Sequence, residues 1–101
     1  MDDSEFESLS DSLLVTLEEA LADRADAELQ GSVLTVQGEE GTWVVNKHLP
    51  TRQIWLSSPR SGARHYVFEP ASGLWRDTRD GADLLATINA ELGVSVRWWP
   101  Q

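Results

Sequence analysis

No cysteine is present among the 101 residues of this chain. That absence excludes disulfide bonds, thiolate metal sites, thiolate-bound clusters and a cysteine nucleophile. Any metal ligands must then be oxygen or imidazole groups. The two histidines, His48 and His65, are isolated from each other in the sequence, so we expect each to be a strand or surface residue rather than a ligand.

Long apolar runs are also missing. No stretch approaches the roughly 18 apolar residues that a membrane-spanning helix needs. The chain begins with acidic residues, whereas signal and transit peptides begin with basic ones. A length of 101 residues with 41% hydrophobic content suits one domain with a modest core. We therefore expect a single-domain protein of the cytoplasm with no membrane partner.

Basic residues are few. Eight Lys and Arg oppose 17 Asp and Glu, which gives a net charge of -9. Nucleic acids and anionic membranes both require a basic footprint, so this charge argues against them as partners. Residues 1–30 hold ten acids against Arg24 alone and account for the whole net charge of -9, while residues 31–101 sum to zero. The expected attractions are cations and basic protein surfaces.

Motifs of catalysis are absent as well. The sequence has no glycine-rich phosphate loop, no Gly-x-Ser-x-Gly elbow and no His-Glu-x-x-His pair. The calcium-loop pattern and the Glu-x-x-His pairing of di-iron bundles are also missing. A binding protein is therefore expected rather than an enzyme with a formed active site.

An acidic amphipathic helix is predicted near the N-terminus. SEFE at residues 4–7 has the form of a capping box, in which Ser4 caps the helix and Glu7 reaches back to the amide of the cap. The helix should continue to about residue 22, with acids along the face opposite its apolar stripe. The stripe consists of Phe6, Leu9, Leu13, Leu17, Ala20 and Leu21.

Short β-rich segments separated by Gly, Pro and Ser follow this helix. They are too close together for crossover connections, so they predict an antiparallel meander. A second helix at about 82–92 should end at Gly93. The fold class is α+β: a two-layer sandwich with both helices on one face of a five- to six-stranded antiparallel sheet. The predicted strands are residues 32–36, 42–47, 52–57, 64–68 and 74–77, with a weaker sixth at 27–30.

The acids of the first helix allow two interpretations. Carboxylates four residues apart, such as Glu7 with Asp11 and Glu19 with Asp23, repel by roughly 0.2 to 0.5 kcal/mol, and no lysine lies between them. Such a face can be merely solvated, with its early acids favoured by the helix dipole. It can also be a site for a cation or a partner. Oxygen donors without a cage suit iron, manganese, calcium or magnesium, bound weakly.

A tryptophan is predicted on the solvent face of the sheet. Within 52–57 the alternation puts Ile54 and Leu56 toward the helices and Trp55 on the other side with Gln53. If Trp43 points inward, Asn46 joins them. Either a loop or the tail covers Trp55, or a partner does, because aromatic and amide groups together are typical of protein-contact hot spots.

At this point the residues resemble a known family, the frataxins, in their bacterial, CyaY-type branch. GTWVVNKHLPTRQIWLSSPRSGARHYVF, at 41–68, is similar to the most characteristic segment of that family. LEEALAD, GSVLTV and LWRDTRDGADL extend the resemblance over most of the chain. It implies a helix-sheet-helix sandwich that binds iron weakly through an acidic ridge, with no organic cofactor.

The resemblance also implies the site residues. The family's metal-binding ridge matches Glu18, Glu19 and Asp23, more loosely Asp26 and Glu28, and is extended by Asp11 and Glu7. Its partner-facing sheet residues match Asn46, Gln53 and Trp55, with Arg64 or His65 at a position that is often basic.

From this resemblance we expect a monomer that regulates iron-sulfur cluster assembly. It would dock on the cysteine desulfurase and the scaffold protein, and iron could drive it to oligomerise. Two alternatives stay open: a ferroxidase that stores iron, and an inhibitor of the desulfurase that acts without metal.

Overall fold

The N-terminal helix α1 (Asp3–Leu21) begins at a different cap from the predicted one. Asp2 is the cap, and its Oδ1 accepts a hydrogen bond of 2.8 Å from the backbone N–H of Glu5. Ser4 lies inside the first turn and the Glu7 carboxylate lies 3.8 Å from Lys47 Nζ of β3, so the predicted capping box is wrong. The predicted apolar stripe is confirmed for Phe6, Leu13, Leu17 and Leu21, while Leu9 is half-buried and Ala20 is exposed, so its inclusion was wrong. The buried residues of α1 are Phe6, Ser10, Leu13, Leu14, Leu17 and Leu21.

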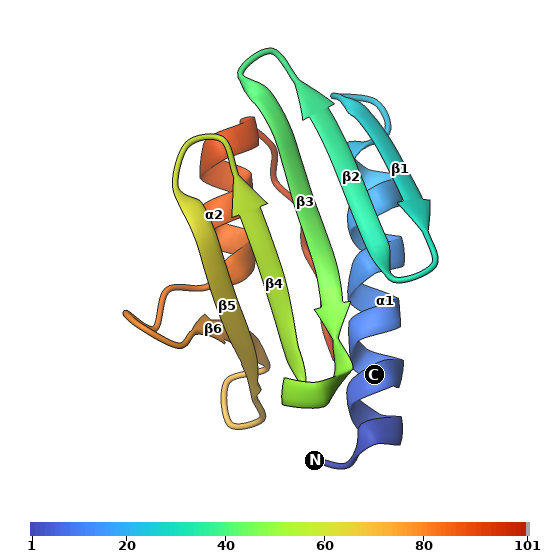
Figure 1. Ribbon diagram of the computed structural model, residues 1–101, viewed down its shortest axis with the longest axis vertical. Helices are drawn as coiled ribbons and strands as arrows, with labels where there is room; N and C mark the ends of the chain where they lie inside the picture. Colours follow the sequence, from blue (N-terminus) through green and yellow to red (C-terminus); the bar gives the residue numbers. More distant parts are fainter. Residues whose placement is uncertain (101) are drawn as a thin grey trace.

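The computed structural model describes residues 1–100, and its sheet has six antiparallel strands in the order β1-β2-β3-β4-β5-β6 (Figure 1). The meander prediction is therefore confirmed, including the weaker strand at 27–30, which is the edge strand β1. A 3-10 turn, η1 (Leu49–Thr51), joins β3 to β4. The strands are β1 (Asp26–Gln30), β2 (Val33–Gly38), β3 (Gly41–His48), β4 (Gln53–Ser58), β5 (Gly62–Glu69) and β6 (Leu74–Asp77).

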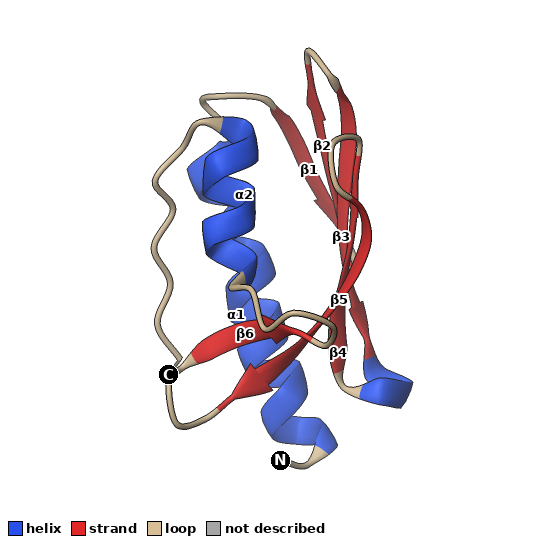
Figure 2. Cartoon of the chain, turned by 90° about the vertical axis from the view of Figure 1, so that its left-hand side faces the viewer, coloured by secondary structure: helices blue, strands red, loops and turns tan. Residues whose placement is uncertain are grey.

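Both helices cover the same face of the sheet, as Figure 2 shows, so the predicted two-layer sandwich is confirmed. Helix α2 (Leu84–Leu92) starts at Asp83, whose side chain accepts a hydrogen bond from the amide of Ala86. It ends at Gly93, whose φ of 67° is left-handed, as the predicted glycine stop requires. Neither helix of residues 1–100 is long and apolar enough to cross a membrane.

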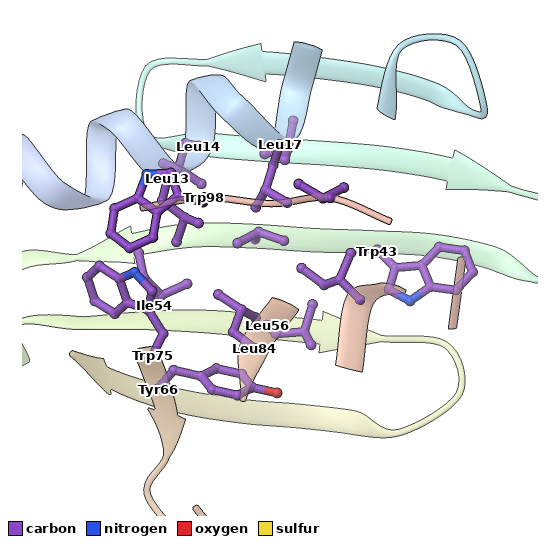
Figure 3. Close-up of a cluster of buried hydrophobic side chains, with 14 of the residues drawn as sticks. Leu13, Leu14, Leu17, Trp43, Ile54, Leu56, Tyr66, Trp75, Leu84 and Trp98 are labelled. Carbon is purple, nitrogen blue, oxygen red and sulfur yellow. The ribbon is translucent and has the colours of Figure 1, made fainter. Parts of the chain in front are cut away.

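The core lies between the sheet and the helices (Figure 3). Strand residues Ile54, Leu56 and Tyr66 meet Leu13 and other residues of α1, and all are fully buried. The tail after α2 runs back along the helices (Figure 2) and adds Trp98, whose Nε1 donates a 3.0 Å hydrogen bond to Ser12 Oγ of α1. One face of the sheet is thus covered by the two helices and the tail. The opposite face and the outer surface of α1 remain for function.

Candidate functional site

The C-terminal half of α1 and strand β1 together carry a row of acidic residues, which we call the α1–β1 ridge: Glu18, Glu19, Asp23, Asp26 and Glu28. Glu18 is half-buried and the other four are exposed. The last turn of α1 contains no basic residue. Since the C-terminal end of a helix carries partial negative charge, acids there are unfavourable and a bound cation would relieve them.

Glu18 has a structural partner within the ridge. Its Oε2 accepts a 2.8 Å hydrogen bond from the backbone N–H of Leu29 in β1. Because β1 is the edge strand, this contact satisfies an amide that the sheet leaves unpaired. The carboxylate of Glu18 therefore ties α1 to the sheet edge.

Within residues 1–100, no lysine, arginine or histidine forms an ion pair with a ridge carboxylate. Arg24 is the nearest cation in the sequence, but its Nη2 donates to the carbonyl of Gly93, at 2.6 Å. Glu28 receives only the neutral side-chain amide of Gln30, at 2.6 Å. The ridge is thus a surface of uncompensated negative charge.

The N-terminal half of α1 is different, because the sheet supplies cations to it. Lys47 of β3 lies 2.9 Å from Asp11 and 3.8 Å from Glu7. Arg52 reaches Asp3 at 2.8 Å. The interpretation that no lysine relieves these acids is therefore wrong for Glu7 and Asp11, since their partner comes from another element and not from the helix.

The seven predicted metal ligands do not converge on one point. In the described part of the chain, no three His, Asp or Glu residues are close enough together to hold one ion. The ridge offers exposed carboxylate oxygens, which are the donors that hard cations prefer. Such a surface fits ions that keep most of their water and bind weakly at several places.

Trp55 lies on the sheet face that the helices do not cover, the face that also carries Asp26 and Glu28 at the β1 edge. Its neighbours in the strand, Ile54 and Leu56, are buried at 0% and 1% exposure, so the predicted orientation is confirmed. In the register of the sheet, Asn46 of β3 and His65 of β5 lie directly beside Trp55. Trp55 Nε1 donates a 2.9 Å hydrogen bond to Gln53 Oε1. Four of the five predicted partner-binding residues therefore share this face.

Two histidines stack on the indole ring of Trp55. The ring centroid of His48 lies 3.8 Å from that of Trp55, and His65 lies 4.5 Å away, with interplanar angles of 14° and 22°. His48 is not among the residues that the sequence analysis predicts for this site. The alternation along β3 contains the signal, because an outward Asn46 implies an outward His48 two residues later.

Arg64 lies on the opposite face of the sheet from Trp55. Its Nη1 lies 2.9 Å from Asp77 and 3.3 Å from Asp80, and Asp77 is almost fully buried at 4% exposure. The hydrogen bond to Asp77 raises the pKa of Arg64, against the opposing effect of burial. Of the two basic candidates, His65 alone joins the Trp55 face. A contact of Arg64 with a partner stays a prediction.

Comparisons with known proteins agree on one family. A family model described as a frataxin-like domain matches residues 1–97. Mitochondrial frataxin of Dictyostelium discoideum is 36% identical over 97 residues, which cover 95% of this chain and 50% of that protein. The mitochondrial frataxin homolog of Schizosaccharomyces pombe is 40% identical over 90 residues, covering 88% and 57%. The chain thus spans about half the length of these curated relatives.

Solved structures give the same result. Frataxin from Psychromonas ingrahamii, described as a model for stability in the CyaY family, superposes with a TM-score of 0.77 at 31% identity, covering 95% of this chain and 96% of that one. A trimeric frataxin from Saccharomyces cerevisiae, complexed with ferrous iron, gives a TM-score of 0.71 at 35% identity, covering 88% and 82%.

Proposed function

The chain belongs to the frataxin family, and on that premise we propose that it is an iron-binding accessory protein of iron-sulfur cluster assembly. The observation that supports this most is the α1–β1 ridge, whose five carboxylates near the C-terminal end of α1 have no paired cation within residues 1–100. Iron is the substrate or cargo of such a protein rather than a resident cofactor. The proposal needs no organic cofactor and no catalytic residue.

The ridge has two tasks in this proposal. Its exposed oxygens bind ferrous or ferric iron weakly, and its negative charge attracts a basic surface of the cysteine desulfurase. Long-range attraction of this kind mainly raises the association rate, and salt screens it within about 8 to 10 Å. We therefore expect iron and the desulfurase to compete for, or share, the same side chains.

The Trp55 face supplies the second contact. Asn46 and Gln53 offer amide donors and acceptors beside a large aromatic ring, which suits a segment of the scaffold protein or an adjoining loop. Truncating a hot-spot aromatic commonly costs about 2 kcal/mol or more, so W55A should weaken docking by about 30-fold. The proposed unit is a monomer with two contacts, the ridge at the α1–β1 edge and the patch around Trp55.

A direct test titrates the protein with ferrous iron under anaerobic conditions and then with the desulfurase, following backbone amides by NMR. We expect broadening at Glu18, Glu19 and Asp23 with iron, and perturbation of the same residues by the desulfurase. If neither ligand perturbs the ridge, the proposal is wrong.

The same samples separate the two alternatives. Oxygen consumption far beyond the amount of bound iron, lost in E18Q/E19Q, would indicate a ferroxidase. Desulfurase binding that is identical with and without iron would indicate an inhibitor that acts without metal. The proposal instead requires stoichiometric uptake of iron and a docking strength that iron changes.

A further inference from the structure

His48, Trp55 and His65 form one stack of rings across strands β3, β4 and β5, which we call the His–Trp–His column. Each strand contributes one ring, and the indole lies between the two imidazoles at centroid distances of 3.8 and 4.5 Å. His48 Nδ1 is 2.8 Å from Thr51 Oγ1 in η1. The hydrogen bond from Trp55 to Gln53 fixes the middle ring.

This geometry limits what a partner can touch. Both faces of the indole are already covered, so the accessible parts are the edge of Trp55 and the outer surfaces of the two imidazoles. Recognition at this face therefore involves the histidines as much as the tryptophan. Val33 and Val67, exposed at 40% and 37%, lie on the same face and extend the surface with apolar contact area.

The charged groups of this sheet face lie toward its two edges. At one edge, Asp26 and Glu28 of β1 share the face, three strands away from Trp55. Glu69 is the one charged residue among the outward positions of β2 to β5 in the described chain, and it pairs with Arg76 of β6 at 3.5 Å. Arg76 also donates to the carbonyl of Gly81, and Arg79, beyond β6, donates to the carbonyl of Ala63. Thr51, Gln53 and Asn46, which face the column from η1, β4 and β3, are neutral.

Histidine side chains change charge between about pH 5 and pH 8. A protonated imidazole carries one positive charge, so this face carries up to two positive charges when both rings are protonated. An imidazolium on the face of an indole is stabilised by the cation–π interaction, so protonation is compatible with the stack. Every charge that the column can acquire is positive, although the chain as a whole carries -9.

We propose that the His–Trp–His column is a proton-dependent recognition element for a carboxylate-bearing segment of the docking partner. The inference rests on the proposed function, since it assigns chemistry to the partner of the Trp55 face. At lower pH the two imidazolium rings donate N–H groups to the carboxylates of the segment. At higher pH this contribution is lost and the neutral contacts remain.

The test measures binding to the desulfurase-scaffold complex at about pH 8 and about pH 6. Two exposed charge pairs should make wild-type binding about tenfold tighter at the lower pH. The double variant H48Q/H65Q removes both titrating groups but keeps polar side chains, and its affinity should change only as the partner itself titrates. H65R should bind at the higher pH more tightly than wild type, because its charge is permanent.

A matched control removes a positive charge elsewhere. Arg97 is exposed in the tail after α2 and forms no ion pair in the described residues, so R97Q should keep the pH dependence of wild type. A second readout needs no partner. In an NMR pH titration of the isolated protein, the indole N–H signal of Trp55 should move together with the ring signals of His48 and His65.

The outcomes separate this inference from the proposed function. If H48Q/H65Q and wild type show equal pH dependence, the column has no proton-dependent role, although docking stands. If Trp55 does not respond as the histidines titrate, the column is not coupled to protonation and the inference is also wrong. If W55A binds as wild type does, the Trp55 face is not a docking surface, so this inference fails while the iron-binding ridge of the proposed function is untouched.

Discussion

Both halves of helix α1 carry acids, four in the N-terminal half and two in the C-terminal half, but their surroundings differ. In the N-terminal half, Lys47 of β3 pairs with Glu7 and Asp11, and Arg52, which follows η1, pairs with Asp3. In the C-terminal half, no cation of residues 1–100 pairs with Glu18 or Glu19. The difference lies in which carboxylates the tertiary structure supplies with a cation. In the proposed function, the paired carboxylates of the first half are structural and the second half binds a metal or a protein.

The largest expected effect is the loss of stabilisation by iron when the ridge is neutralised. A ligand at about 100 times its Kd stabilises a protein by about 2.7 kcal/mol, so ferrous iron should raise the free energy of unfolding of wild type by that amount. E18Q/E19Q/D23N should lose the whole effect, measured by anaerobic urea unfolding with and without iron.

The matched control for this prediction is E7Q/D11N, which neutralises two acids of the same helix in the half that already has a cation. Iron should stabilise this variant as much as wild type. If E7Q/D11N loses the effect of iron and the ridge variant keeps it, the two halves have been assigned the wrong way round.

Removing Lys47 should make the two halves alike. The ammonium group bonds Asp11 and approaches Glu7, and the side chain of Lys47 is only 16% exposed, so K47Q should lower stability by about 1 kcal/mol. It should also free these two carboxylates, so that iron broadens the amides of Glu7 and Asp11 in the variant but not in wild type. A variant as stable as wild type, with no new response to iron, would show that the ion pairs do not matter.

Glu18 should have a local effect that its neighbour lacks. E18A leaves the edge amide of Leu29 without a protein partner and should cost about 0.5 kcal/mol, while E18Q keeps an acceptor oxygen for it. Hydrogen exchange at the Leu29 amide should therefore accelerate in E18A, and change little in E18Q or E19A. Equal exchange in E18A and wild type would mean that the contact is not maintained in solution.

The smallest effect is expected at Arg52 and Asp3. Their side chains are 49% and 61% exposed, and exposed pairs contribute little, so R52Q should lower stability by less than about 0.5 kcal/mol. Glutamine is chosen because Arg52 has a left-handed φ of 52°, and glycine would alter the backbone preference as well. A loss above 1 kcal/mol in chemical denaturation would indicate that this end of α1 depends on the pair.

Most of the fold was predictable because its signals are local. The alternation of Ile54 and Leu56 with Trp55 determines which face of β4 is buried, and Gly93 marks the end of α2. The helix start was not predictable from Ser4 and Glu7 alone, since Asp2 competes for the same role and a tertiary contact attracts Glu7.

The site was predictable in composition but not in its contacts. The contact of Lys47 with Asp11 and the stacking of His48 on Trp55 could not be predicted. Both join residues that are distant in the sequence, and both depend on how the strands pair and pack. Arg64 and His65 are adjacent in the chain, yet the pleat of β5 sends them to opposite faces. The alternation assigns those faces, but the buried Asp77 that holds Arg64 lies 13 positions further along the chain.

The most direct test of the difference between the halves of α1 is an anaerobic titration of wild type with ferrous iron, read amide by amide in NMR spectra. Broadening should begin at Glu18, Glu19, Asp23, Asp26 and Glu28, while Asp3, Glu7 and Asp11 stay sharp until iron is in large excess. Broadening that begins at Glu7 and Asp11, or that is uniform along the helix, would contradict the claim that unpaired carboxylates define the iron surface.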